Sequence, residues 1–218
     1  MNQNVKRAVN DGLGWKDEAG FHVRNYTDYE AYLEKQISKL DGRLGWCQKR
    51  SEELRVALGH RLKVMRIEAG LSVLCLGARL GGEVQAFIDI GCFAVGLDLN
   101  PGDKSMFVIH GDFHQLQFAD SSINIVYINC FDHCLEPAKL LGEIHRVLKH
   151  KGRLILESKA GSDEPEAKSV GSDSWDCLEV DSIKKLSQII QQHGFSERYT
   201  YFTQTSKATP YGLVFGRI

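Results

Sequence analysis

Several features that would narrow the class of this 218-residue chain are missing from it. Basic and acidic residues nearly cancel, 27 against 28, so the positive excess typical of proteins that bind a phosphate backbone is absent. No run of about 18 apolar residues occurs, and the first residues lack the apolar centre of a signal peptide. We therefore expect a cytoplasmic protein with no membrane span and no nucleic-acid partner.

The six cysteines do not form the paired spacings of a structural zinc site. None belongs to a C-x-x-C pair, and Cys75 lies in an apolar run, which is typical of a small buried thiol. Cys130, His133 and Cys134, with His145 further along, are close in sequence but fall short of a zinc pattern. We therefore expect no metal site.

The first 70 residues are expected to form an N-terminal arm and a helical cap. Residues 1–26 are polar and rich in glycine, and we interpret them as an irregular arm. A capping box, Thr27 to Glu30, begins a helix that is expected to end at Asp41-Gly42. A second helix is expected from Ser51 to Gly70, because leucines recur at helical spacing.

From residue 71 to residue 218 the pattern changes to a single α/β domain. Short apolar strands are expected at 71–77, 94–99, 107–110, 123–129 and 153–157, with helices at 82–91 and 137–149. This alternation predicts a parallel sheet with helices on both faces. A polar loop, residues 158–176, and a helix that ends at Gly194 follow. The last two strands, 195–203 and 211–217, are joined by a turn at 207–210, which predicts an antiparallel hairpin at the sheet edge.

A glycine-containing turn after the first strand indicates a nucleotide site. Gly77 and Gly81 lie where a buried strand turns into a helix, and Asp98 follows Gly77 at the end of the next strand. An acidic residue at the end of that second strand can accept hydrogen bonds from both hydroxyls of a ribose. The alternative is a tight turn with an unrelated surface aspartate. A dinucleotide fingerprint would require glycine at Arg79, so a nicotinamide oxidoreductase is disfavoured.

These motifs, with three further ones, resemble the class I S-adenosylmethionine (SAM)-dependent methyltransferases. Gly77, Gly81 and Asp98 are similar to the first motif and the ribose-binding acid of that family. Residues 110–120 are similar to its third motif. Residues 123–133 are similar to its fourth strand and the exit that faces the methyl group, and residues 143–154 are close to its "E-x-x-R-V-L-x-x-G-G" helix and fifth strand.

The resemblance implies a Rossmann-like, doubly wound, mostly parallel seven-stranded sheet with an antiparallel C-terminal hairpin and a helical N-terminal cap. It also implies SAM as the cofactor. By this resemblance, Asp112 is expected to bind the adenine amino group, and Phe113 is expected to flank the adenine ring. The residues expected to bind the cofactor are Gly77, Arg79, Gly81, Glu83, Asp98, Leu99, Asp112, Phe113 and Asn129.

Two positions depart from the family pattern. Cys75 stands where the family usually has an acid, and Arg79 stands where it usually has glycine. We hypothesise that Glu83 replaces the missing acid as the partner of the methionine ammonium, and that Arg79 binds the carboxylate. The alternative for Glu83 is stabilisation of the helix N-terminus.

The methyl acceptor is narrowed mainly by exclusion. The exit of the fourth strand lacks the N-P-P-aromatic turn of nucleobase amino methylation and the Pro-Cys pair of cytosine methylation. The catalytic candidates are His133 and Asp132, with His114 nearby in sequence. We expect methyl transfer, and the acceptor we favour is an oxygen of a small molecule or glycan. The alternative is a catalytically silent partner subunit with the same fold. The sequence leaves the oligomeric state open.

Overall fold

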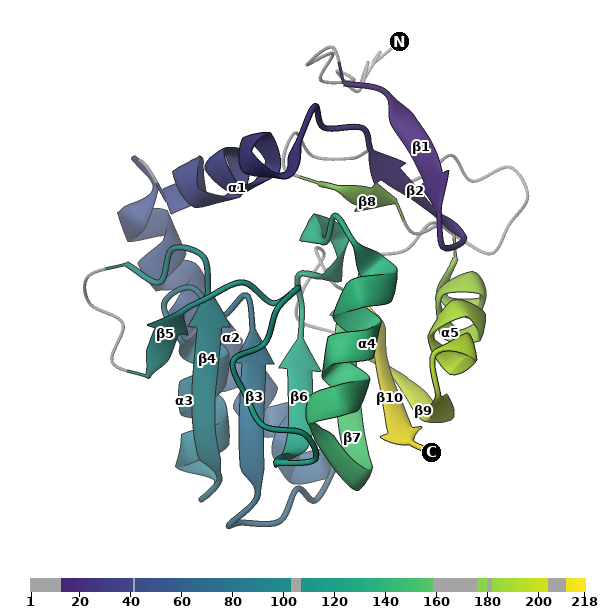
Figure 1. Cartoon of the computed structure of the whole chain (residues 1–218). Helices are drawn as coiled ribbons and strands as arrows, with labels where there is room; N and C mark the ends of the chain where they lie inside the picture. Colours follow the sequence, from purple (N-terminus) through teal and green to yellow (C-terminus); the bar gives the residue numbers. More distant parts are fainter. Residues whose placement is uncertain (1–12, 41, 103–106, 159–175, 180–181, 204–210) are drawn as a thin grey trace, which may run out of the picture.

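The computed structural model describes residues 13–40, 42–102, 107–158, 176–179, 182–203 and 211–218 (Figure 1). The expectations for residues 1–12, for most of the polar loop at 158–176 and for the turn at 207–210 lie outside the described residues.

A seven-stranded sheet with the strand order β5-β4-β3-β6-β7-β10-β9 forms the centre of the fold. Its strands are β3 (Ser72–Leu76), β4 (Phe93–Asp98), β5 (Val108–His110), β6 (Ile123–Ile128), β7 (Leu148–Ser158), β9 (Phe195–Phe202) and β10 (Tyr211–Arg217). The first five are parallel, and β10 pairs antiparallel with both β7 and β9. This confirms the predicted α/β fold. The strand order reverses between β3 and β6, which is where open parallel sheets bind ligands.

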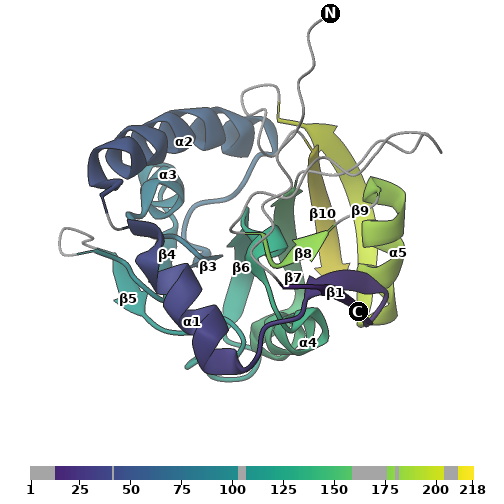
Figure 2. The ribbon, with the colours of Figure 1, turned by 90° about the horizontal axis from the view of Figure 1, so that it is seen from above.

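Two hydrophobic cores lie on opposite faces of the sheet, because successive strand residues point to alternate sides. Leu74 and Leu76 belong to one core with α4 (Pro137–Val147) and α5 (Ile183–Gln192). Val73 and Cys75 belong to the other, with α2 (Leu44–Val64) and α3 (Gly82–Asp89). Figure 2 shows α2 and α3 on one side of the sheet and α4 on the other.

The expectation of an irregular arm is wrong for residues 15–24. β1 (Trp15–Glu18) and β2 (Phe21–Arg24) form an antiparallel hairpin, and β2 also pairs with the short strand β8 (Leu178–Glu179). Ala19 and Gly20 both have positive φ, 51° and 84°, as a two-residue hairpin turn requires. Phe21 and Val23 are buried on one side of β2. The alternation of apolar and polar residues in β2 is too short, among polar neighbours, to be recognised in the sequence.

Helix boundaries in the cap differ from those expected. The N-cap of α1 (Tyr29–Ile37) is Asp28, whose side chain accepts a hydrogen bond from the Ala31 amide at 2.8 Å, and not Thr27. A 3₁₀ turn, η1 (Ser38–Leu40), follows α1. α2 begins at Leu44, before the expected Ser51. The sequence placed the start too late because the first turns of the helix are largely exposed and show no apolar stripe. β7 likewise begins at Leu148 and not at residue 153.

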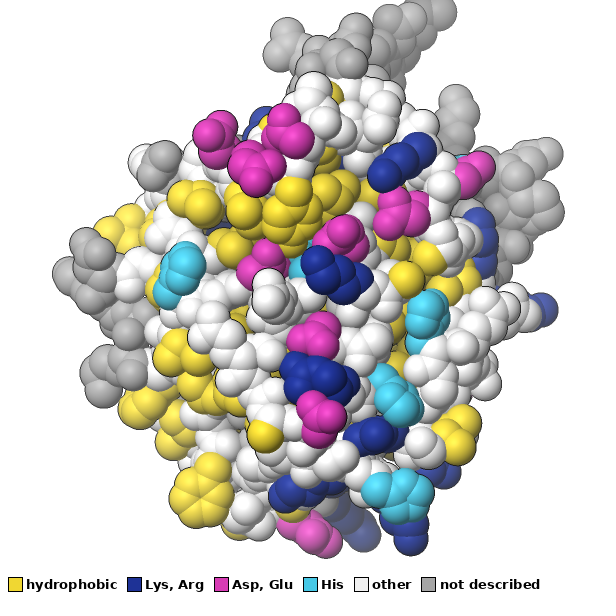
Figure 3. Space-filling view, viewed as in Figure 1, with side chains coloured by type: hydrophobic (Ala, Val, Ile, Leu, Met, Phe, Trp, Pro, Cys, Tyr) yellow, Lys and Arg dark blue, Asp and Glu magenta, His cyan; other side chains and the backbone are white. Residues whose placement is uncertain are grey.

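Of the two cap helices, α1 lies over the carboxyl ends of the parallel strands, above β4 and β3 in Figure 1, whereas α2 lies beside α3 on one face of the sheet (Figure 2). On the face seen in Figure 1, acidic and basic side chains are mixed, and hydrophobic ones gather where α1 approaches α4 (Figure 3). None of the described helices has the length and hydrophobicity needed to cross a membrane.

Candidate functional site

The turn between β3 and α3 brings the backbone close to two neighbouring elements. Gly77 and Gly81 have φ of 66° and 80°, and Arg79 between them also has a positive φ of 44°. A Cβ atom at Gly77 would collide with the Cys130 sulfur at the end of β6. The turn therefore needs glycine at this position for its backbone conformation and for its close approach to β6.

Asp98 ends β4 beside this turn. Its Oδ2 accepts a hydrogen bond from the Arg79 amide at 2.9 Å, and its Oδ1 accepts one from the Asn100 amide at 2.7 Å. Each carboxylate oxygen can accept more than one hydrogen bond, so both remain able to accept from hydroxyl groups. Asp98 is thus fixed in orientation by the turn that it faces.

A small cavity of about 50 Å³ lies between this turn and the N-terminal cap. Its lining residues from the strand ends are Gly77, Arg79, Asp98, Leu99, Asn100, Phe113, Cys130 and His133. The residues that close it from α1 and η1 are Tyr32, Gln36, Ile37, Lys39 and Leu40. The structure thus brings Leu99, Phe113 and Asp98 together in the lining of one cavity.

Asp112 is held by α1 and by its own loop. Tyr29 donates its hydroxyl to Asp112 Oδ2 at 2.6 Å, while Oδ1 accepts from the His114 amide at 2.8 Å and lies 2.9 Å from His114 Nδ1. Burial favours a raised pKa for Asp112, but hydrogen bonds from His114 and Tyr29 lower it below its usual value. His114 Nε2 accepts from the Glu136 amide at 3.2 Å. His114 is therefore a buried structural residue, and Tyr29 is a neighbour of Asp112 that the sequence did not reveal.

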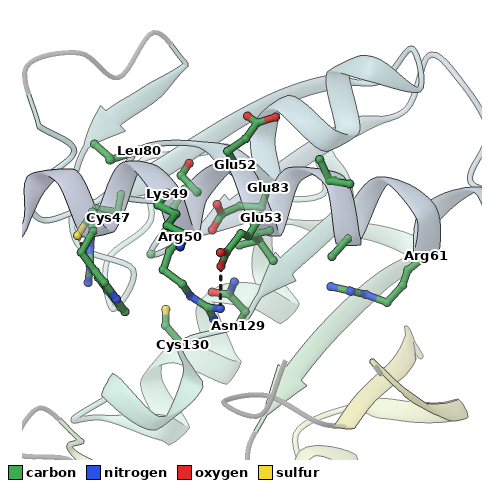
Figure 4. A pocket seen from close by; sticks show the side chains of 18 of the residues that line it. Cys47, Lys49, Arg50, Glu52, Glu53, Arg61, Leu80, Glu83, Asn129 and Cys130 are labelled. Carbon is green, nitrogen blue, oxygen red and sulfur yellow. Dashed lines mark hydrogen bonds and ion pairs between the residues drawn. The ribbon is translucent and has the colours of Figure 1, made fainter. Parts of the chain in front are cut away.

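A larger cavity of about 1050 Å³ lies between α2 and the ends of β3 and β6 (Figure 4). Its wall from α2 contains Trp46, Cys47, Lys49, Arg50, Ser51, Glu52, Glu53, Leu54, Val56, Ala57, His60 and Arg61. The opposite wall contains Gly77, Ala78, Arg79, Leu80, Glu83, Asn129, Cys130 and His133. The two cavities share Gly77, Arg79, Cys130 and His133 and therefore meet at the ends of β3 and β6.

Glu83 and Arg79 lie in the wall of the larger cavity, whereas Cys75 lines neither cavity. Glu83 is 4% exposed, and burial, with a contribution from the charge of Asp98, raises its pKa to about 8. The Arg79 guanidinium contacts the Cys47 sulfur at 3.5 Å. Cys75 is fully buried in the α2–α3 core, so the position at which the family has an acid faces away from both cavities.

His133 lies between two carboxylates at the junction of the cavities. It belongs to η2 (Phe131–His133), and its Nε2 is 3.9 Å from Asp132 Oδ1 while its Nδ1 is 3.8 Å from Asp176 Oδ1. One ligand atom from each of the three residues lies within 4.8 Å of the others, a spacing that a divalent cation can also bridge. Asp176, 43 residues along the chain from His133, belongs to this group and was not a candidate from the motifs.

Lys39 is a second charged residue of the site that was not among the expected catalytic or cofactor-binding residues. It lines the small cavity from η1 and is only 8% exposed. Burial lowers its pKa to about 8, with the Arg79 charge acting in the same direction and Cys177, Cys130 and Asp132 acting against it. No pattern marks it, because Lys39 lies in a 3₁₀ turn whose exposed face and buried face cannot be told apart by helical periodicity.

A buried polar cluster reaches the larger cavity through Arg61, which is the member of the cluster that lines it. The Arg61 guanidinium donates two hydrogen bonds to the Glu157 carboxylate, each 2.9 Å long. The hydroxyls of Tyr127 and Tyr201 also donate to Glu157, at 3.0 and 2.9 Å. Such a satisfied network fixes α2 against the sheet and keeps the Arg61 cation at the cavity wall.

Comparison with known proteins supports the family resemblance. Residues 74–156 match the methyltransferase domain family. The chain is 27% identical over 163 residues to malonyl-[acyl-carrier protein] O-methyltransferase of Pectobacterium atrosepticum, covering 69% of this chain and 62% of that protein. It is 32% identical over 99 residues to demethylmenaquinone methyltransferase of Clavibacter sepedonicus, covering 45% of this chain and 40% of that protein. The chain thus matches less than two thirds of the length of either relative.

The fold also matches that of a solved methyltransferase. The structure of Burkholderia thailandensis 1,6-didemethyltoxoflavin-N1-methyltransferase with bound 1,6-didemethyltoxoflavin and S-adenosylhomocysteine (SAH) superposes with a TM-score of 0.66 at 16% identity. The match covers 94% of this chain and 98% of that one. Residues 74–156 therefore match the methyltransferase domain family, as the sequence motifs indicated, and the chain has the fold of a solved methyltransferase.

Proposed function

We propose that the chain transfers the methyl group of SAM to an oxygen of a small molecule or glycan. The observation that carries this proposal is the meeting of the two cavities at Gly77, Cys130 and His133. The smaller cavity contains the carboxylate suited to ribose, and the larger one is of the size at which proteins bind small molecules. A cofactor that spans the junction presents its methyl group to the larger cavity.

The residues present fit the chemical groups of SAM. Asp98 offers carboxylate oxygens to the ribose hydroxyls, and Leu99 and Phe113 offer apolar contacts to the adenine. Arg79 offers its positive charge to the carboxylate of the methionine part, and Glu83, once it loses its proton, offers a negative charge to the ammonium. When bound, SAM supplies an electrophilic methyl group on a sulfonium. The contribution of the protein is then to align the acceptor with that group and to exclude water.

Binding of the nucleoside requires α1 and η1 to move outward. A cavity of about 50 Å³ holds no more than about one or two water molecules. Tyr32, Lys39 and Leu40 close it from the cap, and Tyr29 fastens α1 to Asp112. We therefore assign to α1 and η1 the role of a cover over the cofactor site.

The acceptor class follows from the cavity wall that the cofactor leaves uncovered. α2 presents Trp46 and His60 to it together with the cations Lys49 and Arg50, of which Arg50 lies 3.4 Å from Glu53. An aromatic ring with nearby cations suits a hydroxylated or carboxylated acceptor. The relative named as an O-methyltransferase also acts on oxygen. The mixed charges on the face shown in Figure 3 do not form the basic stripe expected for nucleic acid.

Calorimetric titration of the full chain with SAM, SAH and NAD tests the cofactor assignment. We expect micromolar binding of SAM and SAH, no binding of NAD, and a loss of about tenfold or more in SAM affinity in Asp98→Ala. Asp120→Asn removes an exposed carboxylate far from both cavities and should leave binding unchanged. Release of SAH with panels of phenols, carboxylates and sugars then identifies the acceptor.

Failure of the folded protein to bind SAM or SAH would contradict this function. It would support the silent partner subunit, for which the departures at Cys75 and Arg79 are the evidence. Binding of SAM without release of SAH with any oxygen acceptor, but with release with an amine, would leave the cofactor assignment intact and overturn the acceptor assignment.

A further inference from the structure

The contacts of His133 assign it a partner outside the methyltransferase motifs. We propose that Asp176 is a positioning residue that orients the His133 imidazole as the proton acceptor for an oxygen nucleophile. This proposal rests on the proposed function. The Asp176 carboxylate is 2% exposed and lies 3.8 Å from His133 Nδ1, and the His133 side chain remains 25% exposed toward the cavities.

Three hydrogen bonds to main-chain carbonyls hold the segments of Asp132, His133 and Asp176 in place. The Cys177 amide donates to the Asp132 carbonyl at 2.8 Å, which joins the segment of Asp176 to η2. The Tyr32 hydroxyl of α1 donates to the His133 carbonyl at 3.2 Å. Arg24 of β2 donates to the Asp176 carbonyl at 3.3 Å. The imidazole therefore occupies a defined position beside Cys130, where the two cavities meet, and is not on a free loop.

The distances between the His133 nitrogens and the two carboxylates suit a base that forms its hydrogen bonds only when substrate binds. Both nitrogen–oxygen separations, 3.8 and 3.9 Å, are longer than hydrogen bonds, as is common at catalytic groups before substrate binds. An Nδ1–H directed at Asp176 leaves the Nε2 lone pair for the acceptor hydroxyl. Asp176 would then act on the imidazole as the orienting carboxylate does in other base–carboxylate pairs.

The reaction conserves the charge in the enclosed space. The acceptor oxygen forms a bond to the methyl carbon, the carbon–sulfur bond breaks with its electron pair on sulfur, and the hydroxyl proton moves to His133 Nε2. The positive charge thus passes from the sulfonium to the imidazolium. Asp132 and Asp176 stabilise that new charge, because each lies within 4 Å of the ring.

Other titratable groups near the ring come from each neighbouring element, and burial keeps the two thiols among them neutral. They are Lys39 of η1, Arg79 of the β3–α3 turn, Cys130 and Asp132 at the end of β6, and Asp176 and Cys177 before β8. The net charge of the enclosed space does not change when the sulfonium charge passes to the imidazolium, so the two carboxylates favour the step only by lying close to the new charge.

Nitrogen-15 NMR of the histidine rings in the full chain tests the proposal without an acceptor. His133→Asn assigns the signal. We expect the wild-type ring to carry its neutral-state proton on Nδ1, and its titration midpoint to fall by about one pH unit or more in Asp176→Asn. Asp176→Glu should restore most of the shift. Glu179→Gln, in the same short segment, is the control and should leave the His133 signal unchanged.

The cofactor provides a second readout. The midpoint should be lower with SAM than with SAH bound, because only SAM carries the sulfonium charge. A neutral-state proton on Nε2, or a midpoint that Asp176→Asn does not move, would overturn the proposal. Binding of Mn²⁺ to the wild type but not to Asp176→Asn, measured by electron paramagnetic resonance, would overturn it in favour of a cation site. Absence of SAM binding would instead contradict the proposed function, since the ligand-free midpoint can be measured without the cofactor.

Discussion

At the scale of single residues, Glu83 shows how burial near a ligand site alters a titration. The carboxyl group lines the larger cavity at the start of α3 and is almost fully buried. Burial raises its pKa to about 8, so the folded protein retains a proton that the unfolded chain loses near its usual pKa of 4.5. Over the pH range between these values the folded state binds more protons, and the free energy of unfolding therefore falls as the pH rises.

Glu83→Gln should remove this loss of stability. We expect the variant and the wild type to be equally stable near pH 4.5, and the variant to be more stable by about 2–4 kcal/mol at pH 8. Urea denaturation at a series of pH values measures the difference. Glu143→Gln gives a trend of opposite sign, because the hydrogen bond from Arg146 lowers the pKa of Glu143. A constant stability difference for Glu83→Gln across this range would contradict the prediction.

The same substitution tests the binding role of Glu83. If the carboxylate holds the ammonium of SAM, SAM affinity should rise in the wild type from pH 6 toward pH 8, as Glu83 loses its proton. In Glu83→Gln we expect no such rise and about tenfold weaker SAM binding at pH 8. Methylthioadenosine, which lacks the amino acid part, should bind both proteins equally. Unchanged SAM affinity in the variant would contradict a role of Glu83 in binding the ammonium.

At the scale of elements, the contact between Tyr29 and Asp112 is one of the polar contacts that dock α1 onto the cofactor site. Tyr29 donates a hydrogen bond to Asp112, and burial together with this bond raises the Tyr29 pKa far above its usual range. Tyr29→Phe should destabilise the closed position of α1, because Asp112 then loses a donor. We expect amides of α1 to exchange hydrogen about tenfold faster in the variant, as measured by mass spectrometry.

The control for this prediction is Tyr199→Phe on β9, where the ring is 43% exposed. It should leave exchange in α1 unchanged. Equal exchange rates in Tyr29→Phe and wild type would show that the other contacts of α1, including those of Tyr32 and Gln36, hold it closed without the Tyr29 hydroxyl.

The sequence predicted those elements whose buried positions produce a regular pattern of apolar residues. β3 and β6 are buried on both faces, and α4 carries an apolar stripe on one face, so their residue patterns indicate strand and helix directly. β8 has two residues and acquires its structure by pairing with β2. No periodic pattern can show a strand of this length, which is why the hairpin and β8 were not expected.

The same physical reason separates the site residues that could be found from those that could not. Gly77, Asp98 and Asp112 follow strands at fixed positions, so the strand pattern locates them. Lys39 and Asp176 reach the site only through the folding of the cap and the pairing of β8. Their roles depend on contacts between segments far apart in sequence, which one sequence does not record.

At the scale of the whole molecule, the cluster around Glu157 joins segments from almost the full length of the described chain. Arg61 of α2, Tyr127 of β6 and Tyr201 of β9 all hydrogen-bond to this carboxylate of β7. Glu157 is 1% exposed, so its charge is stabilised by these donors and not by water. The cluster thus couples the cap helix α2 to three strands of the sheet.

Glu157→Gln should therefore destabilise the protein far more than loss of one phenol. We expect about 3 kcal/mol for Glu157→Gln and about 1 kcal/mol for Tyr201→Phe in urea denaturation at pH 7. The larger value arises because the substitution removes the negative charge that faces the buried Arg61 guanidinium. The paired variant Arg61→Met with Glu157→Leu removes both charges together and should be less destabilised than Glu157→Gln alone. If the paired variant instead loses the sum of the two single effects, the charges act independently, and the cluster does not join α2 to the sheet in the way that its geometry indicates.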